Sequence, residues 1–419
     1  MKKVLLISQH FYPSNIIGAI RPTKIAQKLR QQGYQVDVFT RYQVSPSEIE
    51  RLGLCDHLFA LEDYVPEKGK RAAKKRGRLY QALYHAYLNV LSLKEGKRFL
   101  KKFQSMLQED GVLGETEYDV VLSSFGPMSS LMCGMYYKKI KPQVRWLCDF
   151  RDPVDSKFIE PIIRPIFSWY QARACKRADA IIAVSRGYLE RICRGKYKEK
   201  AFMIPNGYDL EDAACACEAK APEEFLRMSY VGTLYSGSRD LSPVFQALSA
   251  SIQEGKIDAA KLRVSYAGNN FHIILEQAKK YALEQLLEDH GSLSREACLE
   301  LQYSSHLLLL ATWNDKKEYG VFPGKLLEYM LIGKPIISVT SGERPDGEVS
   351  CVIREGRLGV AYEEARSAQD AEELKEALEA YYQQWQAGGS LHFEPEQAVL
   401  ERYSYRTVIA QIEAVISNQ

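Results

Sequence analysis

The stretch from Glu318 to Ile337, EYGVFPGKLLEYMLIGKPII, predicts a loop, then a helix, then a strand. Pro323 suits the start of a helix, where its missing N–H group leaves no hydrogen bond unmade. The helix has one apolar face with helical spacing, formed by Leu326, Leu327, Met330 and Leu331. Gly333 ends it, and the apolar run 335–339 is a short buried strand.

The first turn of this helix is a candidate anion site. Its backbone amides lack partners within the helix and point toward the preceding loop. Lys325 adds a positive charge beside them, and Glu328 follows about one turn later on the same face. A phosphate at the helix start and a carboxylate for sugar hydroxyls would suit a nucleotide-sugar. The same spacing also fits a surface helix with a solvated lysine and glutamate, so both interpretations stay open.

This stretch resembles the signature of the family 4 glycosyltransferases, and most closely the polysaccharide-biosynthesis branch that carries an F-P-S-K-x-x-E-Y-M motif. The resemblance implies a retaining enzyme of the GT-B fold, in which two doubly wound, Rossmann-like α/β domains face a cleft. In that family the second Glu of an E-x7-E pattern binds the donor ribose, which implies this role for Glu328. Phe322, Gly324 and Lys325 stand in the same donor-binding motif.

The sequence departs from the family pattern at one position. The first Glu of the pattern would fall at position 320, where this chain has Gly320. Glu318 lies two positions earlier and is our candidate for the catalytic, sugar-contacting role of that residue.

Size and composition are those of a soluble, two-domain protein. The chain has 419 residues, more than one hydrophobic core normally supports. A net charge of +3 gives no reason to expect a nucleic-acid partner, and nine cysteines without paired C-x-x-C spacing are expected to be reduced thiols in a cytoplasmic protein. No His, Cys or carboxylate spacing indicates a metal site, and we expect no cofactor beyond the nucleotide-sugar substrate.

The N-terminal region reads as a strand, a helix and a second strand. Residues 4–8 and 35–40 are apolar runs, and the helix between them begins near Gly18 and ends at Gly33. The pattern G-A-I-R-x-x-x-I-A-x-x-L that starts at Gly18 resembles the first βαβ unit of the same glycosyltransferases. The resemblance implies that Gly18 and Arg21 border the donor phosphates, although Arg21 also fits an ordinary surface charge at a helix start.

Residues 68–102 have the most unusual composition in the chain. They contain twelve Lys and Arg residues and one acid, Glu95, and an aromatic and leucine-rich run from Leu79 to Leu91 separates two basic clusters. This composition favours contact with an anionic membrane surface. A packed helix with a solvated basic loop and a nucleic-acid patch are the alternatives, the second without any recognisable binding module.

A charged cluster follows the predicted strand at 145–150. Asp149, Arg151 and Asp152 come at the carboxyl end of this strand, where a doubly wound domain places its ligands. A similar D-x-R-D sequence occurs in the related glycosyltransferases. We expect these three residues to contact the acceptor or the sugar, and an internal Asp–Arg ion pair is the alternative.

The second domain begins with a strand and a glycine-containing loop. Gly232 and Thr233 lie within the run 228–235, and Arg239 follows in the loop before a helix from about residue 242. In the family this loop carries basic residues that neutralise the donor diphosphate. The resemblance therefore implies donor contacts from Gly232, Thr233 and Arg239, although Arg239 also fits a solvated loop residue. Further along, residues 348–362 are expected to hold short strands.

We therefore expect an N-terminal Rossmann-like acceptor domain at 1–208, a nucleotide-sugar-binding domain at 209–395, and a C-terminal helix at 396–419 that crosses back to the first domain. The predicted function is transfer of a hexose from a nucleoside-diphosphate sugar to a saccharide or lipid-linked acceptor in cell-surface glycan synthesis. The predicted location is the cytoplasm, with peripheral attachment to the inner face of the plasma membrane. Two alternatives are a catalytically silent, partner-binding relative and a sugar-nucleotide epimerase on the same fold.

Overall fold

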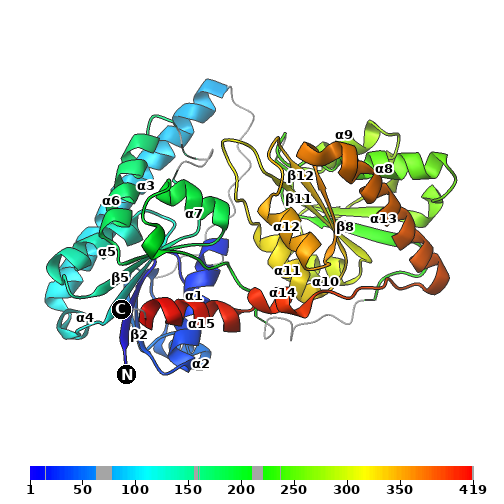
Figure 1. Ribbon diagram of the computed structural model, residues 1–419. Helices are drawn as coiled ribbons and strands as arrows, with labels where there is room; N and C mark the ends of the chain where they lie inside the picture. The colour runs from blue at the N-terminus through cyan, green and yellow to red at the C-terminus, as the bar shows by residue number, and fades with distance from the viewer. Residues whose placement is uncertain are drawn as a thin grey trace. The chain divides into compact units, whose positions relative to one another are not determined.

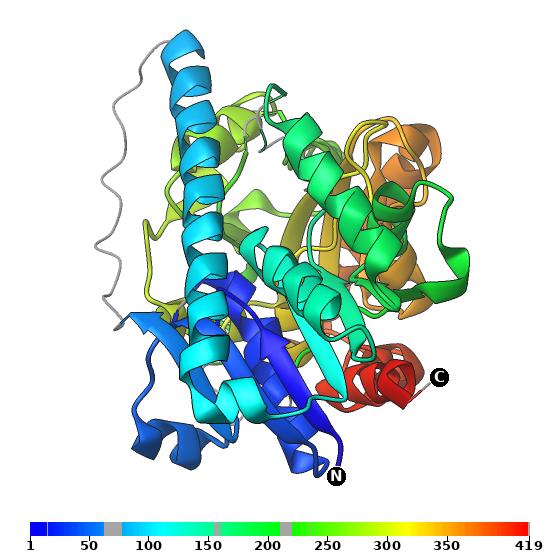
Figure 2. The same cartoon turned by 90° about the vertical axis from the view of Figure 1, so that its left-hand side faces the viewer.

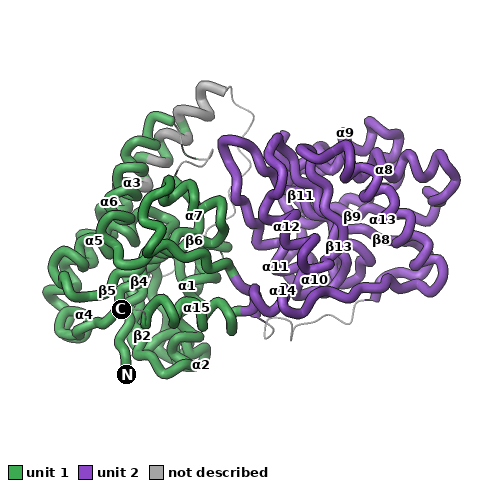
Figure 3. The backbone as a smooth tube through the Cα atoms, in the orientation of Figure 1, with its two compact units in different colours: residues 1–206, 405–419 green, residues 207–404 purple. Residues whose placement is uncertain are grey.

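The computed structural model describes residues 1–14, 16–62, 78–154, 159, 161–209, 220–235 and 237–417. The chain forms two compact units, one of residues 1–206 with 405–419 and one of residues 207–404 (Figure 3). The first basic cluster, at 68–76, lies outside the described residues, as does most of the acidic segment after Asp209. No helix within the described ranges is long and apolar enough to cross a bilayer.

The first unit is built on a parallel sheet in which the described strands follow the order β3-β2-β1-β4-β5-β6-β7 (Figure 1). These strands are β1 (Lys3–Ile7), β2 (Gln35–Tyr42), β3 (His57–Glu62), β4 (Val120–Phe125), β5 (Arg145–Phe150), β6 (Ala180–Ala183) and β7 (Ala201–Met203). The helices are α1 (Ile17–Gln31), α2 (Pro46–Leu52), α3 (Arg78–Glu109), α4 (Gly111–Glu115), α5 (Ser129–Ile140), α6 (Arg164–Arg177), α7 (Arg186–Cys193) and α15 (Tyr405–Ser417).

Successive strand residues point to opposite sides of this sheet, so that both faces carry apolar side chains. Helices cover each face. Leu6 and Val38 face one side, in a core that Ile25 of α1 and Ile409 of α15 complete. Phe39 faces the other side and packs against α3, with ring centroids 4.7 Å from Phe99. On that side α5 contacts both α3 and α6, so the three helices form one layer (Figure 2).

The second unit contains a parallel sheet whose described strands follow the order β10-β9-β8-β11-β12-β13. These strands are β8 (Leu226–Val231), β9 (Leu262–Ala267), β10 (Leu287–Asp289), β11 (Leu307–Trp313), β12 (Ile336–Ser341) and β13 (Gly359–Glu363). The helices are α8 (Ser242–Gln253), α9 (Phe271–Lys279), α10 (Arg295–Tyr303), α11 (Gly324–Ile332), α12 (Glu348–Glu355), α13 (Ser367–Gly388) and α14 (Gln397–Arg402).

The structure confirms the fold class, because each unit is a parallel, Rossmann-like sheet with flanking helices. The expectation of short strands in 348–362 is confirmed only at the end of this stretch, where β13 begins at Gly359. Residues 348–355 form α12, whose buried Val349, Val352 and Ile353 have helical spacing that outweighs their β-branched chemistry. The terminal helix is divided at Tyr403, so that α14 belongs to the second unit and α15 to the first.

Tyr329 fixes α11 against the neighbouring strand, and its loss gives a stability prediction. Its buried hydroxyl donates a hydrogen bond to the carbonyl oxygen of Leu309 in β11, over 3.1 Å. We expect Tyr329→Phe to lower the free energy of unfolding by about 1 kcal/mol, since one buried hydrogen bond is lost and the ring still fills its site. Urea denaturation measures the change, and an unaltered midpoint would show that this bond does not hold the helix.

Candidate functional site

The strand order of the second unit places its candidate site between β8 and β11. From β8 the chain proceeds to β9 on one side of the sheet, and β11 then pairs with β8 on the other side. Loops diverge at such a switch point, so that the carboxyl edge of a doubly wound sheet opens there. The loops that follow β8 and β11 therefore determine what this edge can bind.

Gly232 forms the first part of the site, directly after β8. Its φ angle of 136° is one that residues with a side chain rarely adopt. A Cβ atom at Gly232 would lie 4.0 Å from Cε of Lys325, so the bare backbone here faces the lysine side chain. Gly268 in the next loop packs more tightly, since a Cβ there would lie 2.4 Å from the carbonyl oxygen of Gly232. A side chain at Gly268 would therefore clash with the loop after β8.

Helix α11 supplies the second part of the site. Its preceding residue, Pro323, has extended backbone and no side-chain cap, so the first amides of the helix are not capped by that side chain. Lys325 and Glu328 form a partly exposed ion pair, with Nζ and Oε1 2.8 Å apart. The opposite face of the helix is buried through Leu326 and Met330, as their spacing predicts. The pair holds the ammonium group at the helix start, beside Gly232.

Arg239 shapes the loop after β8. Its Nη1 donates to the carbonyl oxygen of Thr233 over 2.7 Å, and its guanidinium lies 4.7 Å from the ring centroid of Tyr235 and 5.6 Å from that of Trp313. The structure thus brings Thr233 and Arg239 together, through the threonine backbone. Trp313 also lines a cavity of about 570 Å³ at the carboxyl ends of β11, β12 and β13.

The loop before α11 explains the departure from the family pattern. Gly320 has a φ angle of 78°, in the left-handed region that favours glycine. Glu318 is buried, and its backbone N–H donates to Oδ1 of Asp315 over 2.7 Å. Phe322, next to the helix, stacks on Tyr403 with ring centroids 5.3 Å apart. The backbone at position 320 is therefore suited to Gly and disfavours the Glu of the family pattern.

In the first unit, Arg151 joins loops that surround the switch point between β1 and β4. Its guanidinium donates to the carbonyl oxygens of Phe125, Gly126 and Gly18. A Cβ atom at Gly18 would lie 2.6 Å from Nη1 of Arg151, and one at Gly126 would lie 2.5 Å from Nη2. Burial lowers the pKa of Arg151, and neighbouring Asp149 opposes this shift. The absence of a side chain at Gly18 thus makes room for the guanidinium of Arg151. Asp152, the residue after Arg151, is exposed.

Arg21 and Asp149 form a buried ion pair, with 2% and 0% of their surfaces exposed. Nε and Nη2 of Arg21 both donate to the Asp149 carboxylate, and Nη2 also donates to the carbonyl oxygen of Ile204. Nη1 donates to the carbonyl oxygen of Pro205 and to the side chain of Asn206. All N–H groups of the Arg21 side chain are thus engaged within the protein. The structure shows an internal Asp–Arg ion pair, the kind of contact that the sequence left open as the alternative for this cluster.

His10 is a candidate that the sequence reasoning missed. It follows β1 at the switch point, and Nδ1 is buried without a hydrogen-bond partner among the described residues. Burial, with help from Arg151 and Arg41, lowers the pKa of His10 from its ordinary value of 6.5 to about 4. A neutral imidazole at this edge can accept a proton from a hydroxyl group. The only signal in the sequence is a histidine directly after an apolar strand.

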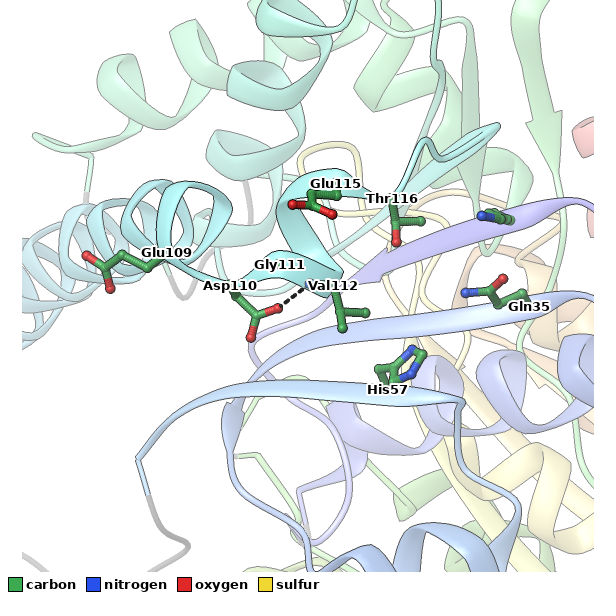
Figure 4. Close-up of a pocket in the computed structure, with 9 residues that line it drawn as sticks. Gln35, His57, Glu109, Asp110, Gly111, Val112, Glu115 and Thr116 are labelled. Atoms are coloured by element: carbon green, nitrogen blue, oxygen red, sulfur yellow. Dashed lines mark hydrogen bonds between the residues drawn. The ribbon is translucent and has the colours of Figure 1, made fainter.

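A larger hollow, of about 680 Å³, lies at the opposite edge of the first sheet (Figure 4). It is lined by Lys3, Gln35 and His57, which begin β1, β2 and β3, and by residues around Asp110. Ligands of doubly wound sheets bind at the carboxyl edge, so we do not place the site in this hollow.

The comparisons with known proteins agree with this architecture. Residues 23–212 match the family model Glycosyltransferase Family 4. Nearly all of this match lies in the first unit, so that it does not include α11. No curated protein sequence matches the chain significantly.

Solved structures match over nearly the full length. The apo lipopolysaccharide outer core galactosyltransferase WaaB is 14% identical with a TM-score of 0.58, and 99% of each chain is covered. Sucrose-phosphate synthase from Thermosynechococcus elongatus is 16% identical with a TM-score of 0.56, covering 99% of this chain and 98% of that one. A putative UDP-N-acetylglucosamine 2-epimerase from Listeria monocytogenes is 12% identical with a TM-score of 0.50, covering 99% and 96%. The chain has the GT-B fold.

The buried pair gives a stability prediction. We expect Arg21→Met to lower the free energy of unfolding by about 3–5 kcal/mol, because Asp149 is left buried without its cation. The double variant Arg21→Met/Asp149→Leu should recover part of this loss, since no charge then remains unpaired. Urea denaturation of the three proteins measures both effects. If Arg21→Met lowers the free energy of unfolding by less than about 1 kcal/mol, the Arg21–Asp149 pair does not hold these loops in position.

The low pKa of His10 predicts a pH dependence of stability. Between pH 6.5 and about 4 the imidazole takes up a proton in the unfolded chain and stays neutral in the folded one. Its contribution to stability is therefore present above pH 6.5 and is lost as the pH falls toward 4. We expect His10→Gln to weaken the fall of the unfolding free energy across this window. If the unfolding free energies of the two proteins fall equally across this pH window, the pKa of His10 is not lowered in the folded protein.

Proposed function

We propose that this protein is a glycosyltransferase that moves a hexose from a nucleoside-diphosphate sugar to a saccharide or lipid-linked acceptor, with retention of configuration. The observation that carries the proposal is the meeting of Gly232, Lys325 and the start of α11 at the switch point of the second sheet. Backbone amides, a helix start and a lysine ammonium together form an environment suited to a diphosphate.

In this proposal the diphosphate lies against α11 and Lys325, and Glu328 accepts hydrogen bonds from the ribose hydroxyls. The bond between sugar C1 and the β-phosphate oxygen breaks, and the electron pair stays on the diphosphate. The acceptor oxygen bonds to C1, and its proton passes to the released diphosphate. The interaction of the Lys325 ammonium with the diphosphate strengthens as negative charge grows on this leaving group. The transition state is therefore stabilised, and the activation barrier for sugar transfer is lowered. Arg239 sets the neighbouring loop and adds positive charge, so that protein cations can do this without a metal.

The first unit is proposed to bind the acceptor at its own carboxyl edge. Arg151 fixes the loops there, and Asp152 remains the candidate for direct contact with the acceptor. In the second unit, Glu318 remains the candidate for contact with the sugar. Ile16, Ile17 and Ile20 are exposed beside Gly18 and offer an apolar rim. Such a rim supports an acceptor with an apolar part, such as a lipid-linked saccharide in cell-surface glycan synthesis. We therefore propose a cytoplasmic enzyme that works at the inner membrane face, with residues 68–102 contributing charge.

One observation favours a second candidate function. Gly320 stands where the family pattern has Glu, and its left-handed backbone suits glycine. This favours a catalytically silent relative that binds a partner, which would show no turnover with any donor. An epimerase on the same fold would instead yield epimerised sugar nucleotide without an acceptor. Product analysis with UDP-, GDP- and ADP-sugars, each with and without lipid extract as acceptor, separates the three functions.

Lys325 provides the most direct prediction for donor binding. We expect Lys325→Ala to weaken the binding of the preferred nucleoside diphosphate about 10- to 100-fold, because one charge-assisted hydrogen bond is lost. Isothermal titration calorimetry measures the affinities.

The matched control is Lys279→Ala at the far end of α9, which ends at the opposite edge of the sheet. It should bind like the unmodified protein. If the Lys325 and Lys279 variants bind the nucleoside diphosphate with equal affinity, the diphosphate does not bind at α11.

A further inference from the structure

Helix α6 and the turn before it carry an exposed stripe that the proposed sugar transfer does not use. Ile162, Ile166, Trp169, Arg173 and Lys176 follow one another at intervals of three or four residues, and all five are exposed. The exposed fractions of the three apolar side chains are 80%, 47% and 53%. Residues on the other face of the helix, such as Phe167 and Ala174, are buried. The stripe is therefore a surface face, with its apolar part at the start of the helix and its cations toward the end.

The charge of this helix has one sign. Residues 161–178 contain Arg164, Arg173, Lys176 and Arg177 and no Asp or Glu. The Arg173 guanidinium lies 4.7 Å from the ring centroid of Trp169, which joins the cationic part of the stripe to its apolar part. A helix face made to remain solvated would be expected to mix charges and to avoid large apolar groups.

Helix α3 repeats the same order along its axis. Tyr84, Tyr87, Leu88 and Val90 are exposed in its first half. Farther along come exposed Lys94, Lys97, Arg98, Lys101 and Lys102, and Glu95 is the one acid between 78 and 102. Two helices far apart in the sequence thus share an apolar start and a cationic continuation.

The fold brings the two starts to the same edge. Both helices follow strands of the first sheet and run antiparallel to them, so that their starts lie toward the carboxyl edge. Both also contact α5, and Figure 2 shows the three helices in one layer. The rise of 1.5 Å per residue places Arg173 about 10 Å along the axis from Ile166, and Lys94 about 15 Å from Tyr84. These spacings exceed the depth of one headgroup layer, about 5–8 Å, so that the long Lys and Arg side chains reach back toward the phosphates.

We propose that the starts of α3 and α6 form a docking surface for an anionic lipid bilayer. Ile162, Ile166 and Trp169 enter the headgroup and acyl boundary together with Tyr84 and Tyr87. The cations behind them, from Arg173 and Lys94 onward, contact lipid phosphates. Charge complementarity selects this occupant, because aromatic and aliphatic side chains ahead of an almost acid-free cationic collar suit a negative interface. The proposal rests on and deepens the membrane location proposed above for residues 68–102, to which it adds α6. The surface lies in the first unit and needs no donor, so that it can be tested by itself.

The test uses the full chain with vesicles of phosphatidylcholine alone or of phosphatidylcholine and phosphatidylglycerol in equal parts. We expect co-sedimentation with the anionic vesicles only, weakened by added salt. Ile166→Ser/Trp169→Ser should weaken this binding at least about tenfold, and Arg173→Gln/Lys176→Gln should weaken it as well. Each change is on an exposed face, and an unchanged urea denaturation midpoint confirms that each variant is folded.

Matched controls come from the opposite edge of the same unit. Val112→Ser/Ile140→Ser removes exposed apolar groups there, and Lys139→Gln/Lys141→Gln removes exposed charges. Both controls should bind anionic vesicles like the unmodified protein. The proposal is overturned if anionic vesicles are not bound or if the control and α6 variants lose binding equally. It is also overturned if the α6 changes alter only the oligomeric state, which would make this face a protein interface.

A spectroscopic readout locates the contact. The chain has four tryptophans, of which Trp146, Trp313 and Trp385 are buried and Trp169 is exposed. Brominated anionic lipid should therefore quench the tryptophan fluorescence of the unmodified protein and have little effect on Trp169→Phe. Equal quenching in both proteins would overturn the assignment of α6. Failure of either membrane test leaves nucleotide binding to the second unit unaffected, so that the two proposals fail separately.

Discussion

The close approach of Gly232 to Lys325 is the constraint on which the candidate site depends. Gly232 directly follows β8 with a φ angle of 136°, which residues with a side chain rarely adopt. A Cβ atom there would lie in ordinary van der Waals contact with Cε of Lys325, 4.0 Å away, so that the lysine side chain lies beside this backbone. Tyr329 and the apolar face of α11 then fix the helix against β11, so that the lysine is presented from a rigid element. Rigid presentation lowers the entropy cost of binding.

The first unit uses its cations in a different way. Arg21 and Arg151 direct their guanidinium groups at backbone carbonyls and at Asp149, and so hold together loops that lie far apart in the sequence. Their charges are used for positioning, because the hydrogen bonds they make are internal. At the carboxyl edge of this unit, a ligand can instead contact the neutral imidazole of His10 and the apolar rim near Ile17. Such an edge suits an uncharged hydroxyl with an apolar neighbour better than a second phosphate.

The fold could be predicted from the sequence because buried parallel strands are continuous apolar runs, and those at 4–8, 35–40 and 335–339 all became strands. Helix α11 was predicted by its spacing and by its terminal proline and glycine. Helix α12 was not, since its valines and isoleucine also suit a short strand. The partners of Arg21 could not be predicted, because Asp149 is 128 residues away and only the folded sheet brings the two together. The same limit applies to Arg151, whose carbonyl partners carry no sequence signal.

Hydrogen exchange with each of UDP, GDP and ADP tests the central claim most directly. A bound nucleoside diphosphate should slow amide exchange in residues 232–235 and 322–328, because those backbone groups would be covered or hydrogen-bonded. The amino edge of the second sheet should exchange unchanged. Protection confined to these two segments, by one nucleotide above the others, is the result the account predicts. Protection elsewhere in the second unit, with neither segment affected, would contradict it.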